Sequence, residues 1–361
     1  MRSARISTTI LLSLLVWCEA PLAAADSPEQ PSTKLFRIAT PRGVGYIDAT
    51  GAIVIAPRFV EAFHFSEGLA PASLDGTKYG HIDPTGEFAI PPQFDLATSF
   101  HEGRAGVCLE GRWGFIDRSG TTIVPTVFDH TDDFEDGVAY VGALPAWSGK
   151  LARYLQDIRR YRWTYIDREG VEIGEPNFQG NGSNTLLPLR KGSKKGYVNR
   201  RGEMVMAPRF EIASRFHEGL AFVAEDGEIG YIGADGAYQI EPQFAVGGDF
   251  QDGVAIVARN TPAGPAYGLI DTTGKPILPF IYHELSRASE ELFAFRIQKG
   301  SKVGYLTKDG VVRIEPQYDH GFPFMNGIAE VSIDRKRCWI DSSGKLVWDG
   351  RVASPGSRFR R

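Results

Sequence analysis

One short pattern recurs nine times along this chain of 361 residues, and it constrains the fold more than any other feature. In its best-preserved form the pattern is Gly, aromatic, aliphatic, Asp, two variable residues and Gly, as in Gly45–Asp48 followed by Gly51. The copies begin at positions 45, 80, 114, 164, 196, 230, 268, 304 and 338. One step is 50 residues and the others are 32 to 38. A period of this length is typical of a repeat protein in which each copy is one structural unit.

Alternating apolar and polar residues predict three β-strands in each copy. In the second copy these strands cover Leu69–Leu74, Tyr79–Asp83 and Glu87–Ile90. Alternation over four to six residues is the period of a half-buried strand. An apolar residue, any residue and a proline follow the turn, and we expect the proline to end the third strand because it has no N–H for a ladder. Each copy therefore predicts a three-stranded β-meander.

The Asp and Gly of each copy predict a tight turn between the second and third strands. An Asp carboxylate at the first turn position accepts backbone N–H groups, and Gly supplies the positive φ that such a turn requires. We assign a structural turn role to Asp48 and Gly51, Asp83 and Gly86, Asp117 and Gly120, Asp167 and Gly170, Asp271 and Gly274, and Asp341 and Gly344.

A three-stranded unit of about 35 residues cannot bury an apolar face alone, so the nine units must stack. Propellers usually have four to eight blades of four strands. A ring also often closes by mixing strands from both chain ends, whereas this array starts and stops in phase, at about residues 35 and 349. We therefore predict an all-β array of nine β-meanders in an open, twisted solenoid or superhelix. The alternative is a closed, β-propeller-like ring.

The pattern resembles the WG (KWG) repeat of bacterial proteins. The segment Gly111–Asp117, with its Trp113-Gly114 pair, matches that signature best, and other copies carry different residues in the tryptophan position. The resemblance covers nearly the whole chain after its first residues. It implies a bacterial source and a tandem β-repeat, and it implies no established activity.

The first residues are typical of a secretory signal peptide. Arg2 and Arg5 precede an apolar stretch at 10–17, and Ala23–Ala25 supplies small residues for cleavage before Asp26. Lipoprotein processing at Cys18 is the less favoured alternative, because that chemistry needs a small residue where Trp17 stands. We expect export to the periplasm or beyond.

The domain organisation follows from these features. Residues 1–25 are the expected signal peptide, 26–34 a short linker, 35–349 the repeat domain and 350–361 a disordered basic tail. No stretch after the signal peptide is apolar for long enough to cross a membrane. A net charge of −4 gives no reason to expect a nucleic-acid partner.

The 50-residue step contains an insertion at about 145–162. Apolar residues at helical spacing predict a short amphipathic helix there, and several arginines make it basic on an acidic protein. Insertions in a repeat array often carry its binding function, although this one could only cap an exposed edge. The candidate partner-binding residues are Arg153, Tyr154, Arg159, Arg160 and Arg162.

Residues that suggest chemistry mostly follow the repeat. An acid precedes Gly in each Phe-x-acid-Gly segment, at Glu67, Glu102, Asp136, Glu218 and Asp252. Stacking aligns these acids in a stripe, where two carboxylates could reach the ~5–9.5 Å that glycoside hydrolysis needs. A solvated acid before a turn glycine is the simpler interpretation. Histidines such as His101 and His217 also keep one position of the repeat, too far apart to share a metal.

Together these features predict an exported, non-enzymatic β-repeat scaffold that binds a protein, peptide or glycan in the bacterial envelope. We expect no catalytic residue, no metal and no cofactor. The alternatives are a carbohydrate-active enzyme that uses stripe carboxylates such as Glu102 or Glu218, and a purely structural spacer. Cys108 and Cys338 are expected to be buried free thiols.

Overall fold

The computed structural model describes residues 34–143, 162–174, 186–287 and 292–350, all within one compact unit, Thr33–Arg361. These residues form nine small antiparallel sheets that follow one another along the chain, and we call them blades 1 to 9. Among the residues described, no helix has the length and apolar character needed to cross a membrane.

Blades 1 to 5 contain strands β1 to β17. Blade 1 contains β1 (Phe36–Thr40), β2 (Gly43–Ile47) and β3 (Ile53–Phe59), and blade 2 contains β4 (Glu61–Ala62), β5 (Ala70–Ser73), β6 (Tyr79–Ile82) and β7 (Phe88–Phe94). Blade 3 contains β8 (Leu96–Ala97), β9 (Ala105–Leu109), β10 (Arg112–Ile116) and β11 (Thr122–Phe128). Blade 4 contains β12 (His130–Thr131), β13 (Val138–Ala143) and β14 (Arg162–Asp167), and blade 5 contains β15 (Leu187–Lys191), β16 (Lys194–Val198) and β17 (Met204–Phe210).

The last four blades repeat this plan. Blade 6 contains β18 (Ile212–Ala213), β19 (Ala221–Glu225), β20 (Glu228–Ile232) and β21 (Tyr238–Phe244), and blade 7 contains β22 (Val254–Thr261), β23 (Gly264–Asp271) and β24 (Pro276–Tyr282). Blade 8 contains β25 (Glu284–Arg287), β26 (Leu292–Arg296), β27 (Val303–Thr307) and β28 (Val312–Tyr318). Blade 9 contains β29 (His320–Met325), β30 (Ile328–Ile333), β31 (Lys336–Asp341) and β32 (Leu346–Trp348).

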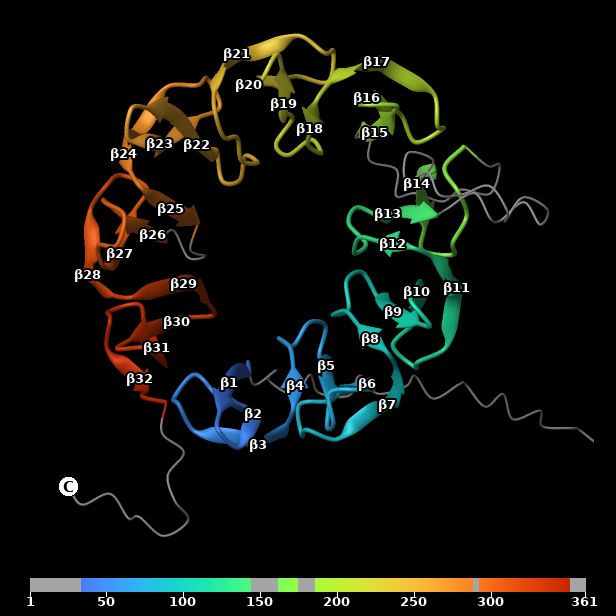
Figure 1. The fold of residues 1–361 in the computed structure, drawn as a ribbon, viewed down its shortest axis with the longest axis vertical. Helices are drawn as coiled ribbons and strands as arrows, with labels where there is room; N and C mark the ends of the chain where they lie inside the picture. Colours follow the sequence, from blue (N-terminus) through green and yellow to red (C-terminus); the bar gives the residue numbers. More distant parts are fainter. Residues whose placement is uncertain (1–33, 144–161, 175–185, 288–291, 351–361) are drawn as a thin grey trace, which may run out of the picture. The chain divides into compact units, whose positions relative to one another are not determined.

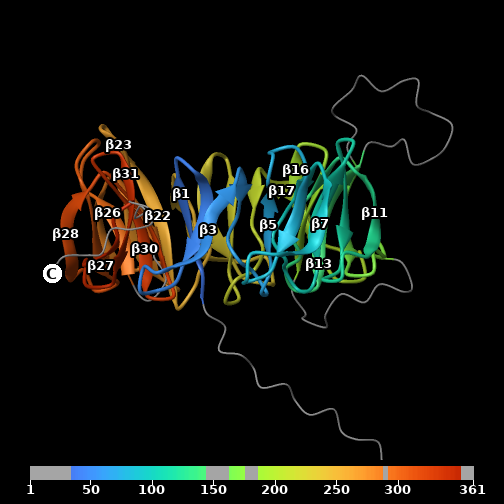
Figure 2. The same ribbon diagram turned by 90° about the horizontal axis from the view of Figure 1, so that it is seen from below.

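Within a four-stranded blade the strands lie in chain order from the centre outwards. In blade 2, for example, β4 lies toward the central opening and β7 lies on the outside (Figure 1). We call these the inner and the outer strand. The turn between β5 and β6 lies at the hairpin end of the blade, and the tight turn at 83–86 lies at the opposite end, the turn end. Seen from the side, the blades form one band with these two ends as its faces (Figure 2).

The blades close into a ring, so the prediction of an open solenoid is wrong and the ring-shaped alternative fits (Figure 1). Blade 1 and blade 9 share one cluster of buried side chains, which contains Phe36, Ile38, Ile47, Ile328, Trp339 and Trp348. The rings of Phe36 and Trp339 lie 5.4 Å apart between centroids. The fold is therefore a nine-bladed β-propeller.

The ring closes without an exchange of strands between the two chain ends. An array that starts and stops in phase with the repeat can therefore still form a ring. In most blades the Gly of the tight turn lies against the outer strand of the preceding blade, so that a Cβ on Gly86 would lie 2.9 Å from Ile55 Cγ2. Gly51 of blade 1 makes the same approach to blade 9, where a Cβ would lie 2.3 Å from the Val347 carbonyl oxygen. The first and last blades therefore pack as other neighbours do.

The outer strands run through the prolines that were expected to end them. β7 continues past Pro91 and Pro92, and its register with β6 shifts between the Tyr79–Phe94 and His81–Ile90 pairs. Such a bulge leaves extra residues unpaired, and a proline on an edge strand has no ladder N–H to lose. The prediction failed because it treated the third strand as one that needs partners on both sides.

Candidate functional site

Most of the predicted partner-binding residues, namely Arg153, Tyr154, Arg159 and Arg160, lie outside the described residues. Arg162 is the first residue of β14, where it pairs with Ala143 of β13. The insertion therefore joins two strands of blade 4 at the hairpin end of the ring.

The Asp residues of the tight turns bind the backbone of their own turn. Asp48 Oδ1 accepts the N–H groups of Thr50 and Ala52 at 2.8 and 3.0 Å, and Gly51 has φ 87°. The hydrogen bond from the Thr50 hydroxyl lowers the pKa of Asp48, and the backbone N–H groups add to this against the effect of burial. The same contacts recur at Asp83, Asp117, Asp167, Asp271 and Asp341.

Three acids of the Phe-x-acid-Gly segments, Glu67, Glu102 and Glu218, connect neighbouring blades. Glu67 Oε2 accepts the N–H of Gly103 at 3.0 Å, one blade further along the ring. Glu102 and Glu218 bind in the same way to the N–H groups of Gly137 and Gly253, at 2.7 and 2.9 Å. These acids are more than solvated residues before a turn. Sequence reasoning missed the role because each partner lies a whole repeat away.

Glu102 also pairs with a cation. Its Oε2 lies 2.7 Å from Arg168 Nη2 in the tight turn of blade 4. Burial opposes the charge on Glu102, but the hydrogen bonds from Arg168 and from the Gly137 N–H lower the pKa of the carboxyl overall. A glycosidase general acid requires the opposite shift. Glu102 is therefore arranged to hold two blades together.

Most blades have three long strands, and the second of them is β2 in blade 1 and β6 in blade 2. In several blades a tyrosine of this second long strand forms a further link to the next blade. Hydroxyl groups donate to a carbonyl oxygen of the next blade in the pairs Tyr46–Phe63, Tyr165–Pro188, Tyr197–Ser214, Tyr231–Gly248 and Tyr305–Phe322, at 2.6 to 3.0 Å. His81 occupies the same position, with Nε2 2.9 Å from the Thr98 carbonyl oxygen. Burial lowers the pKa of His81, so this histidine is neutral and serves the fold.

Ion pairs recur at the hairpin end. A cation at or just before the start of the second long strand (β6 in blade 2) pairs with the first acid of the next blade. The pairs are Lys78–Asp95, Arg112–Asp129, Lys194–Glu211 and Lys302–Asp319. Blade 2 differs, because Val60 occupies the position of these acids and is 54% exposed. The Val60 N–H donates to the carbonyl oxygen of Ser73. The residue after Ser73 is Leu74, and it is 51% exposed. We call Val60 and Leu74 the hairpin patch.

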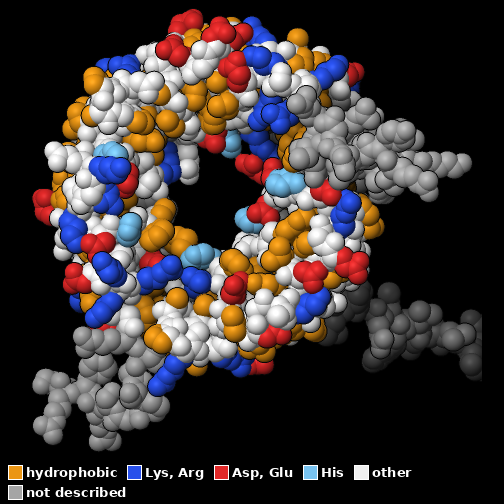
Figure 3. Space-filling view, in the orientation of Figure 1, with side chains coloured by type: hydrophobic (Ala, Val, Ile, Leu, Met, Phe, Trp, Pro, Cys, Tyr) orange, Lys and Arg blue, Asp and Glu red, His pale blue; other side chains and the backbone are white. Residues whose placement is uncertain are grey.

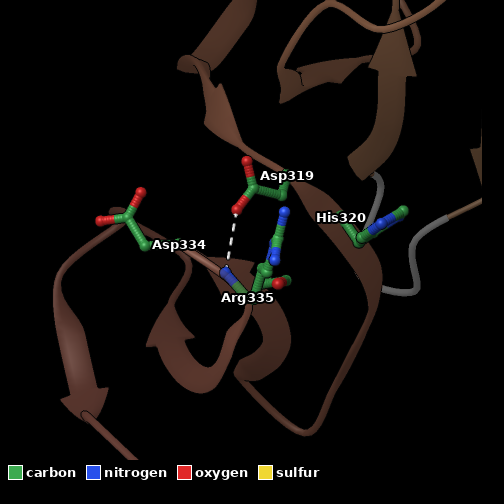
Figure 4. A pocket seen from close by; sticks show the side chains of 5 residues that line it. Asp319, His320, Asp334 and Arg335 are labelled. Atoms are coloured by element: carbon green, nitrogen blue, oxygen red, sulfur yellow. Dashed lines mark hydrogen bonds between the residues drawn. The ribbon is translucent and has the colours of Figure 1, made fainter.

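Blade 9 contains an open pocket of about 690 Å³ at its hairpin end (Figure 4). It is lined by Asp319, His320, Ser332, Asp334 and Arg335. The Arg335 N–H donates to Asp319 Oδ2 at 3.3 Å. Its lining residues are polar or charged, and they come from both the start of β29 and the turn that follows β30.

Within the described ranges no group of three or more His, Cys, Asp or Glu side chains is placed to hold a metal ion. Cys108 and Cys338 are free and buried.

Several solved structures share a remote similarity with this chain. BamB from Moraxella catarrhalis shares 12% identity over 87% of this chain and 90% of its own, with a TM-score of 0.39. A catalytically inactive virginiamycin B lyase from Staphylococcus aureus, solved with quinupristin, shares 13% over 88% and 95%, with a TM-score of 0.29. The quinohemoprotein alcohol dehydrogenase ADHIIG from Pseudomonas putida HK5 shares 11% over 85% and 68%, with a TM-score of 0.38. Similarities this low support no statement about activity or partners.

The repeat itself gives the family. No curated protein matches the chain. A model of the WG containing repeat matches residues 45–77, 79–113, 113–142, 196–228, 267–302 and 304–336, which together exceed half of the sequence. The matched segments carry the glycines, turns and outer strands described above. The chain belongs to the WG containing repeat family.

Proposed function

We propose that this protein is an exported, non-enzymatic scaffold that binds a protein partner in the bacterial envelope through the hairpin end of its propeller. The observation that carries the proposal is the hairpin patch. Val60 and Leu74 are both more than half exposed, at a place where other blades carry an ion pair. Adjacent exposed apolar side chains with polar surroundings are a common mark of a protein interface.

The links between blades support a binding role. Acids such as Glu67 and Glu218 and hydroxyl groups such as that of Tyr231 are used to join one blade to the next. A ring joined in this way presents its surface with little loss of conformational entropy on binding. The insertion of blade 4 begins and ends at the same hairpin end, so its arginines are a second candidate contact.

The proposal is tested by capture from native envelope with matched variants. Val60→Asp with Leu74→Glu places charges where blade 3 has Asp95 and blade 6 has Glu225. Val205→Asp changes an apolar residue that is 50% exposed on the outer strand β17, and it serves as the control. We expect one partner to be retained by the wild type and by Val205→Asp and lost from the double variant, with unchanged melting temperatures.

Two results would count against this function. Equal capture by all three proteins would remove the hairpin patch as the contact. Absence of any captured partner would favour the spacer alternative. Export is tested separately, since N-terminal sequencing of the exported protein should begin at Asp26, and an intact Met1 would contradict the signal peptide.

A further inference from the structure

Blade 1 has no inner strand among the described residues. In blades 2, 3, 4, 6, 8 and 9 an inner strand pairs with the first long strand, as β4 does with β5, β8 with β9, β12 with β13, β18 with β19, β25 with β26 and β29 with β30. In blade 1 the sheet begins with β1 itself, which lies toward the central opening (Figure 1). Among the described residues, the inner edge of β1 is therefore an edge of its sheet, as that of β15 is in blade 5.

The register shows which backbone groups line this edge. β1 pairs with β2 up to Thr40 and Gly43 at a two-residue turn, so Arg37 and Ala39 direct their N–H and C=O groups away from β2. In blade 2 the equivalent residues are Pro71 and Ser73, whose carbonyl oxygens accept the N–H groups of Phe63 and Val60. Within the described part of the chain, Arg37 and Ala39 have no such backbone partner. The edge has the same form as one that accepts a strand elsewhere in the ring.

The neighbouring blades leave an apolar side chain beside this edge. Phe322 of β29 is 49% exposed, at a position where blades 6 and 8 have Ser214 and Ser286. A Cβ on Gly321 would lie 2.6 Å from the Tyr305 hydroxyl of blade 8, so this side of β29 is closed by blade 8. The register of β29 shifts after Gly321, and the Phe322 side chain is left exposed on the inner strand of the blade that adjoins blade 1. On the blade 2 side, Arg37 Nε donates to the Ala62 carbonyl oxygen at 2.6 Å.

The charge beside the edge is positive. Arg42 is exposed at the turn after β1, and neither Arg37 nor Arg42 forms an ion pair with a described residue. Arg335 lines the pocket of blade 9, the blade that adjoins blade 1 (Figure 4). In the space-filling view, Lys and Arg side chains gather at the lower left of the opening, with an acidic side chain beside them at the bottom and further acids on the right (Figure 3). These cations favour an acidic ligand at the edge of β1, although the net charge of the whole protein is negative.

We propose that the inner edge of β1 binds an extended, acidic segment of a partner protein as an added β-strand. The backbone of the segment pairs with Arg37 and Ala39, and strand addition of this kind takes its affinity from main-chain hydrogen bonds. Apolar side chains on one face of the segment pack against Phe322, and acids meet Arg42. This site is separate from the hairpin patch, so either proposal can fail alone.

The test uses the mature chain, residues 26–361, and a fluorescein-labelled peptide of alternating glutamate and valine, eight residues long. We expect saturable binding by fluorescence anisotropy. Ala39→Pro removes one N–H of the edge and leaves the β1–β2 ladder intact, so it should weaken binding at least tenfold. Ala39→Val keeps that N–H and should bind as the wild type does. Phe322→Ser installs the residue of blades 6 and 8 and should weaken binding with little effect on folding.

Several outcomes would overturn the proposal. Equal affinity of the wild type and Ala39→Pro, or of the glutamate peptide and one with lysine in place of glutamate, excludes acidic strand addition at this edge. No saturable binding at millimolar peptide has the same meaning. Binding that requires removal of residues 26–33 would assign the edge to the chain's own N-terminal segment.

Discussion

Gly80 in β6 and Ile90 in β7 come so close that a Cβ added to Gly80 would lie 2.2 Å from the Ile90 carbonyl oxygen. The same approach occurs between Gly114 and the Val124 carbonyl oxygen, at 2.4 Å. In each case the bulged outer strand passes over the glycine of the second long strand. The repeated glycine and the repeated proline are therefore two halves of one structural feature.

Replacing Gly80 by alanine should destabilise the ring by about 2–3 kcal/mol, because either the bulge or β6 must move to accommodate the Cβ. Urea unfolding measures this change. Gly103→Ala is the matched control, since Gly103 has φ 75° and no atom within 4 Å of the added Cβ. Its cost should be about 1 kcal/mol, from backbone conformation alone. Equal costs at the two sites would contradict the role of the bulge.

Glu102 should make stability depend on pH. Its folded-state pKa is lowered by Arg168 and the Gly137 N–H against the effect of burial, so the ionised carboxylate stabilises the fold above the unfolded pKa of about 4.3. That contribution is lost as the pH falls through the lower, folded pKa. Glu102→Gln should therefore cost about 1–2 kcal/mol at pH 7, and this cost should shrink in acid as the Glu102 carboxylate becomes protonated in the folded protein. Urea unfolding at pH 7 and in acid measures the difference, and a cost that does not change with pH would exclude the ion pair as its source.

The sequence predicts the single repeat unit better than it predicts how the nine units assemble. The number of units and the three long strands of most of them are predictable because turn residues such as Asp83 and Gly86 and the alternation around them act locally. The prediction of three strands in each unit was wrong for the five blades that have a fourth, short inner strand. Closure is not predictable in this way. Whether Phe36 meets Trp339 depends on a small rotation between blades that accumulates over the whole array, and no short segment encodes it.

The candidate site is also predictable only where its features lie within one copy of the repeat. The link from Glu67 to the Gly103 N–H joins two copies of the repeat, so neither copy alone reveals it. The hairpin patch does leave a signal, since Val60 stands where the next two copies have Asp95 and Asp129. That signal requires alignment of the connecting segments as well as of the turns. The inner edge of β1 leaves no signal in the sequence, because it is defined by a strand that the described residues do not supply.

The insertion of blade 4 gives a separate prediction about binding. Arg159→Glu with Arg160→Glu should weaken capture of the envelope partner at low salt without changing the melting temperature, since reversed charges repel an acidic surface. Capture by the variant is compared with that by the wild type at the same ionic strength. If capture survives at low salt, the insertion is not a contact and the hairpin patch acts alone.

The most direct test of the closed ring is a double-mutant cycle between its two ends. Phe36→Leu and Trp339→Leu are made singly and together, and the free energy of unfolding is measured for all four proteins. Residues in contact couple, whereas distant ones are additive. Packed against each other as in the structure, the two aromatic side chains should show a coupling of about 0.5–1.5 kcal/mol. Strict additivity would mean that blades 1 and 9 do not meet, and it would contradict the propeller.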